Sequence, residues 1–151
     1  MMINFNSQIC TTREQSKRLL DLGLKKETAD MYYPNGIQDS EHIIRAIYPA
    51  FWESDTKIDA FIKGRVTPAW SLHRLMEMIP FNLKDKKGYI YGFVIEDDNT
   101  ISYYYFAEQF WHCHKYWGKS NLYDNFIDCI EWLIKEGYFN KEYLEELCGK
   151  H

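Results

Sequence analysis

The strongest constraint on the fold lies in the last third of the chain, in residues 121–144. Apolar side chains recur there every three or four residues over 122–136, and charged side chains occupy the opposite side. Gly137 follows where a left-handed residue commonly ends a helix, and Asn140 can cap a further turn or two to Leu147. The segment therefore predicts a long helix that buries one face against another layer.

Two further helices have recognisable starting residues. Thr11 and Thr12 each stand three residues before a Glu or a Gln, which is the spacing of a capping box, so a helix is expected over 11–22. Ser71 is the expected N-cap of a short helix that ends at Pro80. These patterns predict helices in the N-terminal and central parts of the chain.

A β-hairpin is predicted in the second half of the chain. Residues 88–96 and 101–106 are rich in aromatic and β-branched residues, and a polar Asp-Asp-Asn-Thr segment separates them. Residues 107–120 either extend the second strand or form a loop before the last helix. Residues 32–67 leave helix and strand open, because short apolar runs such as 43–48 fit both.

These elements predict an α+β fold in a single domain over residues 1–151, with a small antiparallel sheet packed by the N- and C-terminal helices. The aromatic fraction of 17% is high. The predicted strands carry apolar residues on both faces, so the sheet needs a second cover besides a helix. A protein partner or a second copy of the chain would provide that cover.

Charge and apolar content argue against several classes of protein. The net charge of −4 argues against nucleic-acid binding, which depends on neutralising phosphates. No apolar run approaches the roughly 18 residues of a membrane-spanning helix, and the first residues do not resemble a secretory signal. The four cysteines are scattered, without a CxxC pair. We therefore expect a cytoplasmic protein with reduced thiols and no membrane association.

Three segments together resemble a known group of proteins. They are residues 10–31, 68–80 and 121–144, which cover about half of the chain. Their order and spacing are similar to small proteins of Bacteroides-type gut bacteria and their prophages. The resemblance implies a bacterial cytoplasmic or phage-associated setting. It implies no activity and supplies no functional residues, because no catalytic role is assigned to members of the group.

The segment His112-Cys113-His114 is the most distinctive local candidate for chemistry. On an extended strand the two histidines point to one face and Cys113 to the other. Two imidazoles can begin a zinc site, but such a site needs three or four protein ligands. His73 or His42 could supply the third, although no spacing demands it. We expect ordinary packing of these histidines, no bound metal and no cofactor.

Other reactive side chains have simpler structural explanations. Cys129 falls on the apolar side of the last helix and is expected to be buried. The carboxylates of residues 96–98 fall at the predicted hairpin turn, where Asp and Asn are favoured for backbone reasons. Ser71 lacks the glycines of a nucleophile elbow, and the chain has no glycine-rich phosphate loop.

The sequence thus favours a small non-enzymatic protein, phage-associated, that acts as an accessory or protein-binding domain through a protein partner or self-association. The expected interaction surface includes Tyr103, Tyr105, Trp111 and Trp117, since Tyr and Trp are common anchors of interfaces. The alternative is a small metal- or thiol-dependent enzyme centred on His112, Cys113 and His114. A third hypothesis is a single-stranded nucleic-acid binder that stacks bases on residues 103–106.

Overall fold

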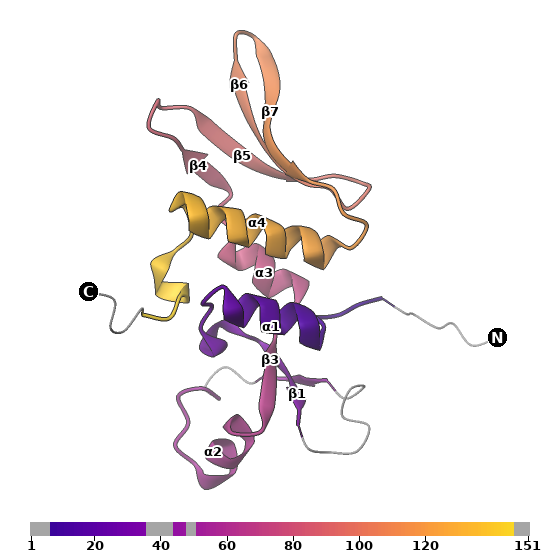
Figure 1. Ribbon diagram of the computed structural model, residues 1–151, viewed down its shortest axis with the longest axis vertical. Coiled ribbons are helices and arrows are strands. Elements are labelled where there is room, and N and C mark those ends of the chain that lie inside the picture. The colour runs from indigo at the N-terminus through magenta and orange to yellow at the C-terminus, as the bar shows by residue number, and fades with distance from the viewer. Residues whose placement is uncertain (1–6, 36–43, 48–50, 147–151) are drawn as a thin grey trace, which may run out of the picture. The chain divides into compact units, whose positions relative to one another are not determined.

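The computed structural model describes residues 7–35, 44–47 and 51–146 (Figure 1). Its contacts group into two compact units, residues 1–74 and 75–151, and each contains helices and an antiparallel sheet. The predicted α+β fold class is therefore confirmed. That the two units form one domain stays a prediction.

The first unit contains a three-stranded sheet and two α-helices. In chain order its elements are α1 (Arg13–Asp21), η1 (Lys26–Thr28), β1 (Met31–Pro34), β2 (Arg45–Ala46), α2 (Lys57–Lys63) and β3 (Val66–Ala69). The strand order is β2-β1-β3, and both pairings are antiparallel. Helix α1 packs against β3, and α3 (Leu72–Met78) follows β3 in the chain.

The start of α1 shows which of the two predicted capping boxes forms. The Thr12 hydroxyl accepts a hydrogen bond from the Gln15 amide at 3.1 Å, and the Gln15 side chain accepts one from the Thr12 amide at 3.0 Å. Thr11 is buried instead, and its hydroxyl accepts a hydrogen bond from the Trp70 amide at 3.0 Å. The helix therefore begins at Arg13 after the Thr12 cap, one of the two that the sequence predicts, whereas Thr11 binds the residue that follows β3.

Residues 32–67, for which the sequence leaves helix and strand open, contain short elements. Arg45 and Ala46 form β2, so residues 45–46 are strand rather than helix, and much of 39–48 lies outside the described residues. The apolar run at 58–62 belongs to α2, which Thr56 caps by accepting a hydrogen bond from Asp59 at 3.2 Å. A strand of two residues has no periodicity, so no sequence pattern could reveal it.

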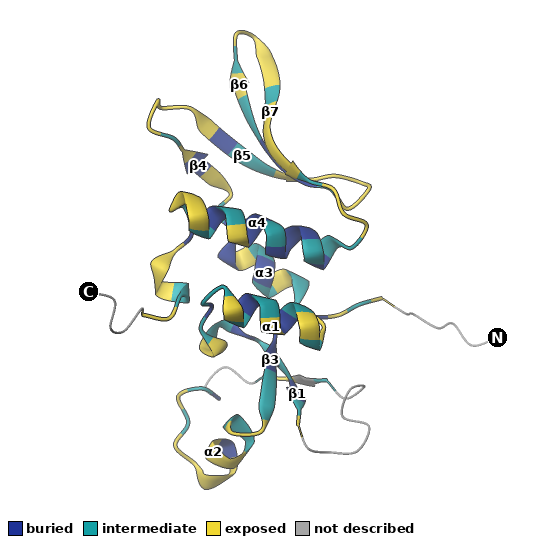
Figure 2. Cartoon of the chain, in the orientation of Figure 1, coloured by how far each residue is buried: buried dark blue, intermediate teal, exposed yellow. Residues whose placement is uncertain are grey.

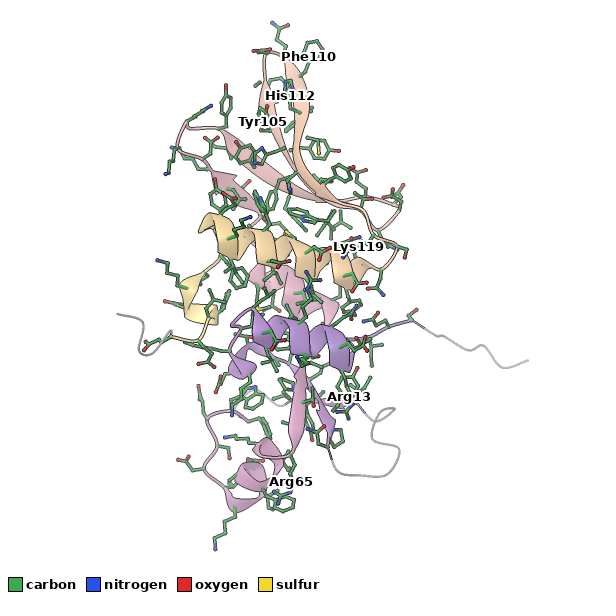
Figure 3. All side chains as sticks on the ribbon, in the orientation of Figure 1. Arg13, Arg65, Tyr105, Phe110, His112 and Lys119 are labelled. Atoms are coloured by element: carbon green, nitrogen blue, oxygen red, sulfur yellow. The ribbon has the colours of Figure 1, made fainter. Side chains whose placement is uncertain are left out.

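Arg13 connects the sheet of the first unit to α1. Its guanidinium donates to Asn35 at 2.6 Å and to Thr67 at 3.2 Å, and it lies over the ring of Tyr33 at 4.8 Å (Figure 3). A further hydrogen bond reaches the Pro34 carbonyl. One side chain thereby joins α1 to β1, β3 and the residue after β1.

Ser71 caps α3, as predicted. Its hydroxyl accepts a hydrogen bond from the Arg74 amide at 3.1 Å and donates one to the Asp30 carboxylate. Asp30 also accepts from the Ser71 amide at 2.8 Å. Both carboxylate oxygens of Asp30 therefore hold the start of this helix. These hydrogen bonds give Ser71 a structural role as the helix cap.

Replacing Ser71 by alanine should destabilise the protein by about 1–2 kcal/mol, since the helix loses its cap and Asp30 loses one donor. Chemical denaturation followed by circular dichroism measures this change. Ser7→Ala, at an exposed position, is the matched control and should leave the midpoint unchanged. Equal midpoints for Ser71→Ala and wild type would contradict the capping role.

The second unit is built on a four-stranded antiparallel sheet with the order β4-β5-β6-β7. Its elements are β4 (Asn82–Lys84), β5 (Ile90–Ile95), β6 (Ile101–Ala107), β7 (Phe110–Trp117), α4 (Leu122–Glu136) and η3 (Lys141–Tyr143). The predicted hairpin is confirmed as β5 and β6. Residues 107–120, for which strand and loop are both compatible with the sequence, contain a further strand, β7.

The turn between β6 and β7 explains why no sequence pattern indicates that strand. Glu108 and Gln109 form the turn, with φ angles of 54° and 68°. A type I′ hairpin turn has a left-handed backbone conformation at both central residues, which are normally Asn and Gly. Glu-Gln carries no such signal, so the hairpin is not evident from the sequence, although its strands are rich in aromatic residues.

Helix α4 has the bounds that the sequence predicts, and it lies along one face of the sheet (Figure 1). Its side chains Phe126, Ile130 and Leu133 are fully buried, and α4 contacts both β6 and β7 (Figure 2). Gly137 ends it with a φ of 79°. The amphipathic helix that the sequence predicts thus packs against the sheet of the second unit.

Leu133→Ala should lower the free energy of unfolding by roughly 2–5 kcal/mol, because the change shortens a fully buried side chain and leaves a cavity beside α4. Lys135→Ala, on the exposed side of the same helix, should change it by no more than about 0.5 kcal/mol. Urea denaturation of the two variants measures both values. A similar effect of the two substitutions would mean that the buried side of α4 has been misassigned.

Candidate interaction surface

The strands of the four-stranded sheet place alternate side chains on two faces, which we call inner and outer. The inner face packs on α4: the ring of Phe93 lies 5.8 Å from that of Phe126, and the ring of Tyr103 lies 6.0 Å from that of Trp132. The outer face is the opposite one. It carries Asn82, Lys84, Ile90, Gly92, Val94, Ser102, Tyr104, Phe106, Trp111, Cys113 and Tyr116.

The inner face corrects part of the predicted interaction surface. Tyr103 is fully buried, and its hydroxyl donates to the Pro80 carbonyl at 2.7 Å. Burial raises the pKa of this phenol far above its usual value. Tyr103 therefore belongs to the core and cannot bind a partner. The reason is that β6 turns Tyr103, rather than Tyr104, toward α4.

Two more residues of the predicted surface also belong to the inner side. Trp117 is half-buried, with its ring 5.6 Å from Trp132 of α4. Tyr105 is half-buried and packs against Tyr91, with 5.4 Å between ring centres. Of the four predicted residues, Trp111 alone lies on the outer face. The sequence pattern identified the aromatic residues but not the face of each one.

His112 and His114 lie on the inner side, as strand alternation predicts. His112 stacks on Tyr105, with 5.1 Å between ring centres (Figure 3). His114 stacks on Tyr91, with 4.2 Å between ring centres. Within the ranges that the structure describes, no three His, Cys, Asp or Glu side chains gather as metal ligands, and His42 lies outside those ranges. That the protein binds no metal stays a prediction.

The thiols fall into two environments. Cys113 is exposed on the outer face, opposite Tyr104, whereas His112 pairs with Tyr105 on the inner side. Cys129 is buried in α4, and that burial raises the pKa of its thiol. The two neighbouring imidazoles therefore lie across the sheet from Cys113, whereas a base that activates a thiol has to stand beside it.

The outer face is largely apolar on β5, β6 and β7, and most of it is open to solvent, although Ser102 is buried. Five of its side chains are exposed to between 40% and 70%: Val94 40%, Phe106 57%, Ile90 61%, Tyr116 67% and Trp111 70%. A shallow groove of about 430 Å³ runs over Gly92, between Val94, Tyr104 and Trp111. Gly92 leaves this space open because it has no side chain, and a Cβ there would meet nothing within 4 Å.

The two ends of the outer face carry opposite charges. Lys84 pairs with Ile90 where β5 begins, and Lys86 and Lys87 follow in the turn between β4 and β5. The other end of β5 leads into the turn Glu96-Asp97-Asp98. Asp85 lies between these lysines in the chain and accepts a hydrogen bond from the hydroxyl of Tyr91, a residue of the inner face, at 2.5 Å. We call Lys84, Lys86 and Lys87 the basic end, and residues 96–98 the acidic end.

The carboxylates of the acidic end also have the turn role that the sequence predicts. Asp98 accepts a hydrogen bond from the Thr100 amide at 3.1 Å, and hydrogen bonding from Thr100 lowers the pKa of Asp98. Glu96 accepts one from the Tyr104 hydroxyl at 2.9 Å, which raises the pKa of Tyr104. Asp98 is therefore ionised at neutral pH and keeps this end negative.

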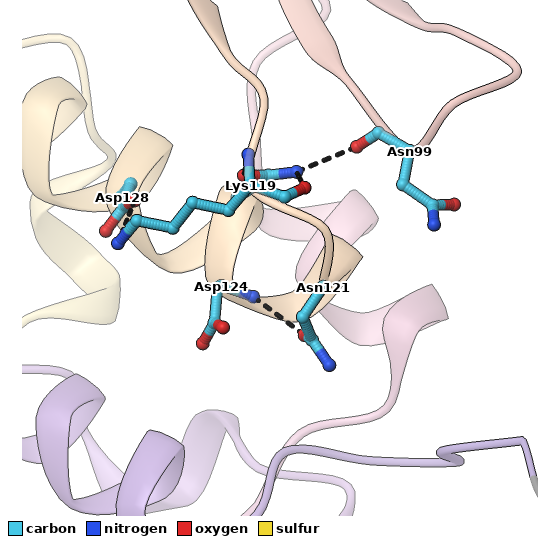
Figure 4. Close-up of polar contacts among 6 residues, drawn as sticks. Asn99, Lys119, Asn121, Asp124 and Asp128 are labelled. Atoms are coloured by element: carbon cyan, nitrogen blue, oxygen red, sulfur yellow. Dashed lines mark hydrogen bonds and ion pairs between the residues drawn. The ribbon is translucent and has the colours of Figure 1, made fainter.

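A buried amide holds the acidic turn in place, and no sequence pattern indicates it. Asn125 of α4 donates to the Asn99 carbonyl at 2.9 Å and to the Lys119 carbonyl at 2.7 Å, and it accepts from the Lys119 amide at 2.7 Å. Lys119 also forms an ion pair with Asp128 at 2.8 Å (Figure 4). The acidic end of the outer face is thereby fixed to the helix on the other side of the sheet.

Comparisons of the chain with protein-family models, with curated proteins and with solved structures found no match. Among the described helices, none has the length and apolar content needed to span a membrane.

Alkylation should distinguish the thiols of the native protein. In dilute solution, Cys113 should react with iodoacetamide in the folded state, whereas Cys10 and Cys129 should react only after unfolding, because both are buried. Peptide mass spectrometry measures the extent of labelling at each site. Rapid labelling of Cys129 in the folded protein would contradict the packing of α4 on the sheet.

Proposed function

We propose that the protein is a non-enzymatic binding module and that a protein partner docks on the outer face of its four-stranded sheet. The observation that carries this proposal is the row of exposed apolar side chains on β5, β6 and β7, which includes Ile90, Phe106 and Trp111. Contiguous apolar surface of this kind is typical of protein–protein contacts.

Sheet architecture supports the proposal. An antiparallel sheet with one face in solvent normally places polar side chains on that face. Here the solvent-facing positions hold Ile90, Val94 and Trp111 instead, so leaving them in water is costly. A partner that covers them gains the free energy of burying this surface.

The chemistry of the face favours a protein over a nucleic acid. Binding a single strand by stacking requires a basic groove beside the aromatic rings. The groove beside Trp111 ends at Glu96, and the turn that follows it is acidic. Mixed charges at the ends of an apolar centre are typical of protein interfaces, which have an apolar core and a polar rim.

The cellular setting is part of the proposal. We propose a phage-associated accessory role, supported by the resemblance of residues 10–31, 68–80 and 121–144 to small proteins of gut bacteria and their prophages. Gene neighbourhood tests it: location among phage genes supports the role, and location in an operon of metabolic enzymes contradicts it.

A photocrosslinking amino acid at Trp111 tests the docking surface directly. In extracts of cells that carry the gene, this variant should form a discrete adduct with a protein, either another chain or the protein itself. Phe61, which is exposed at 60% on α2, gives the matched control position. An adduct from Phe61 should be absent or differ from that formed at Trp111.

Competition with unlabelled protein shows whether the adduct at Trp111 comes from a specific contact. Excess unlabelled wild-type protein should abolish the adduct, whereas excess Trp111→Lys protein should not, because a lysine places a charge in the apolar centre of the interface. The lack of any saturable adduct from Trp111 would refute the proposed function. So would equal competition by wild type and Trp111→Lys.

A further inference from the structure

We infer that the partner of the outer face is a second copy of this chain, which forms a twofold-symmetric dimer with the two sheets face to face. This inference rests on the proposed function and names its partner. Its basis is the arrangement of charge around the apolar centre, together with the area that the face can bury.

The charges of the outer face complement those of a second copy. The basic end contains Lys84, Lys86 and Lys87, and the acidic end contains Glu96, Asp97 and Asp98. The two ends are separated by β5, whose six residues span roughly 20 Å at about 3.3 Å per residue. Between these ends the side chains of the outer face, such as Val94 and Trp111, are uncharged.

Twofold symmetry brings opposite ends together. The twofold axis lies in the plane between the two facing sheets and runs perpendicular to β5. Rotation by 180° about this axis gives β5 of the second copy the opposite direction. The basic end of each copy then faces the acidic end of the other, so the contact occurs twice. The strands of the two sheets remain nearly aligned, which is one of the two usual arrangements for sheets packed face to face.

The area of the face fits a stable dimer. Aromatic side chains bury roughly 150–250 Å² each, so Phe106, Trp111 and Tyr116, at about two-thirds exposure, contribute roughly 400 Å² per copy. Ile90 and Val94 and the charged ends add to this. The total approaches the ~800 Å² per partner of an ordinary specific interface.

Charge reversal tests the inference. The acidic-end variant is Glu96→Lys with Asp97→Lys, and the basic-end variant is Lys86→Glu with Lys87→Glu. All four positions are exposed. In sedimentation velocity the wild type should dimerise, and each variant alone should associate at least about tenfold more weakly, because its facing ends then repel each other.

Mixing the two variants should restore the dimer. Both ends of the acidic-end variant are basic and both ends of the basic-end variant are acidic, so a one-to-one mixture should form a heterodimer of near wild-type affinity. Native mass spectrometry identifies it, since the two chains differ in mass. Thermal melting of each variant, expected near that of the wild type, confirms that the fold is intact.

Three results would overturn the inference. They are a wild type that stays monomeric up to about 1 mM, a dimer whose affinity does not respond to either charge reversal, and a mixture that forms no heterodimer. If the wild type is monomeric while Trp111 crosslinks to another protein, this inference fails and the proposed function stands. If Trp111 crosslinks to nothing, both fail.

Discussion

Helix α4 covers one face of the four-stranded sheet, and the rest of the second unit depends on that contact. Helix α4 meets the inner face through Phe126, which packs against Phe93, and through Trp132, which packs against Tyr103. At one end of the sheet, the amide of Asn125 holds the turn after β5 to the helix. Strand alternation then determines the environment of the other residues in β5, β6 and β7, because each side chain lies either on the side of α4 or on the opposite face.

The same contact explains the surroundings of the two histidines in β7. Tyr91, Tyr105, His112 and His114 pack on one another at the inner side, so both imidazoles are stacked against phenol rings. The rings of Phe106 and Trp111 lie on the outer face and are exposed to solvent. The aromatic residues of this unit are therefore divided between a core that α4 completes and a surface that a partner would complete.

The sequence predicts the features that depend on neighbouring residues, but not those that depend on residues distant in the chain. The bounds of α4, the cap at Ser71 and the hairpin of β5 and β6 follow from local patterns, and all three were predicted. The strand β7 was not, because Glu108 and Gln109 are unusual in a tight turn. Tyr103 was expected on the surface because alternation shows which residues share a face but not which face meets a helix. That choice depends on packing between segments distant in the sequence.

Fluorine NMR on protein labelled with 5-fluorotryptophan tests most directly whether a second copy covers the outer face. The chain has five tryptophans, each giving one resonance that single substitutions assign. As concentration rises, the resonance of Trp111 should shift or broaden, while that of the buried Trp70 should stay unchanged. A Trp111 resonance that stays constant and solvent-accessible from micromolar to millimolar concentration would contradict a dimer through this face.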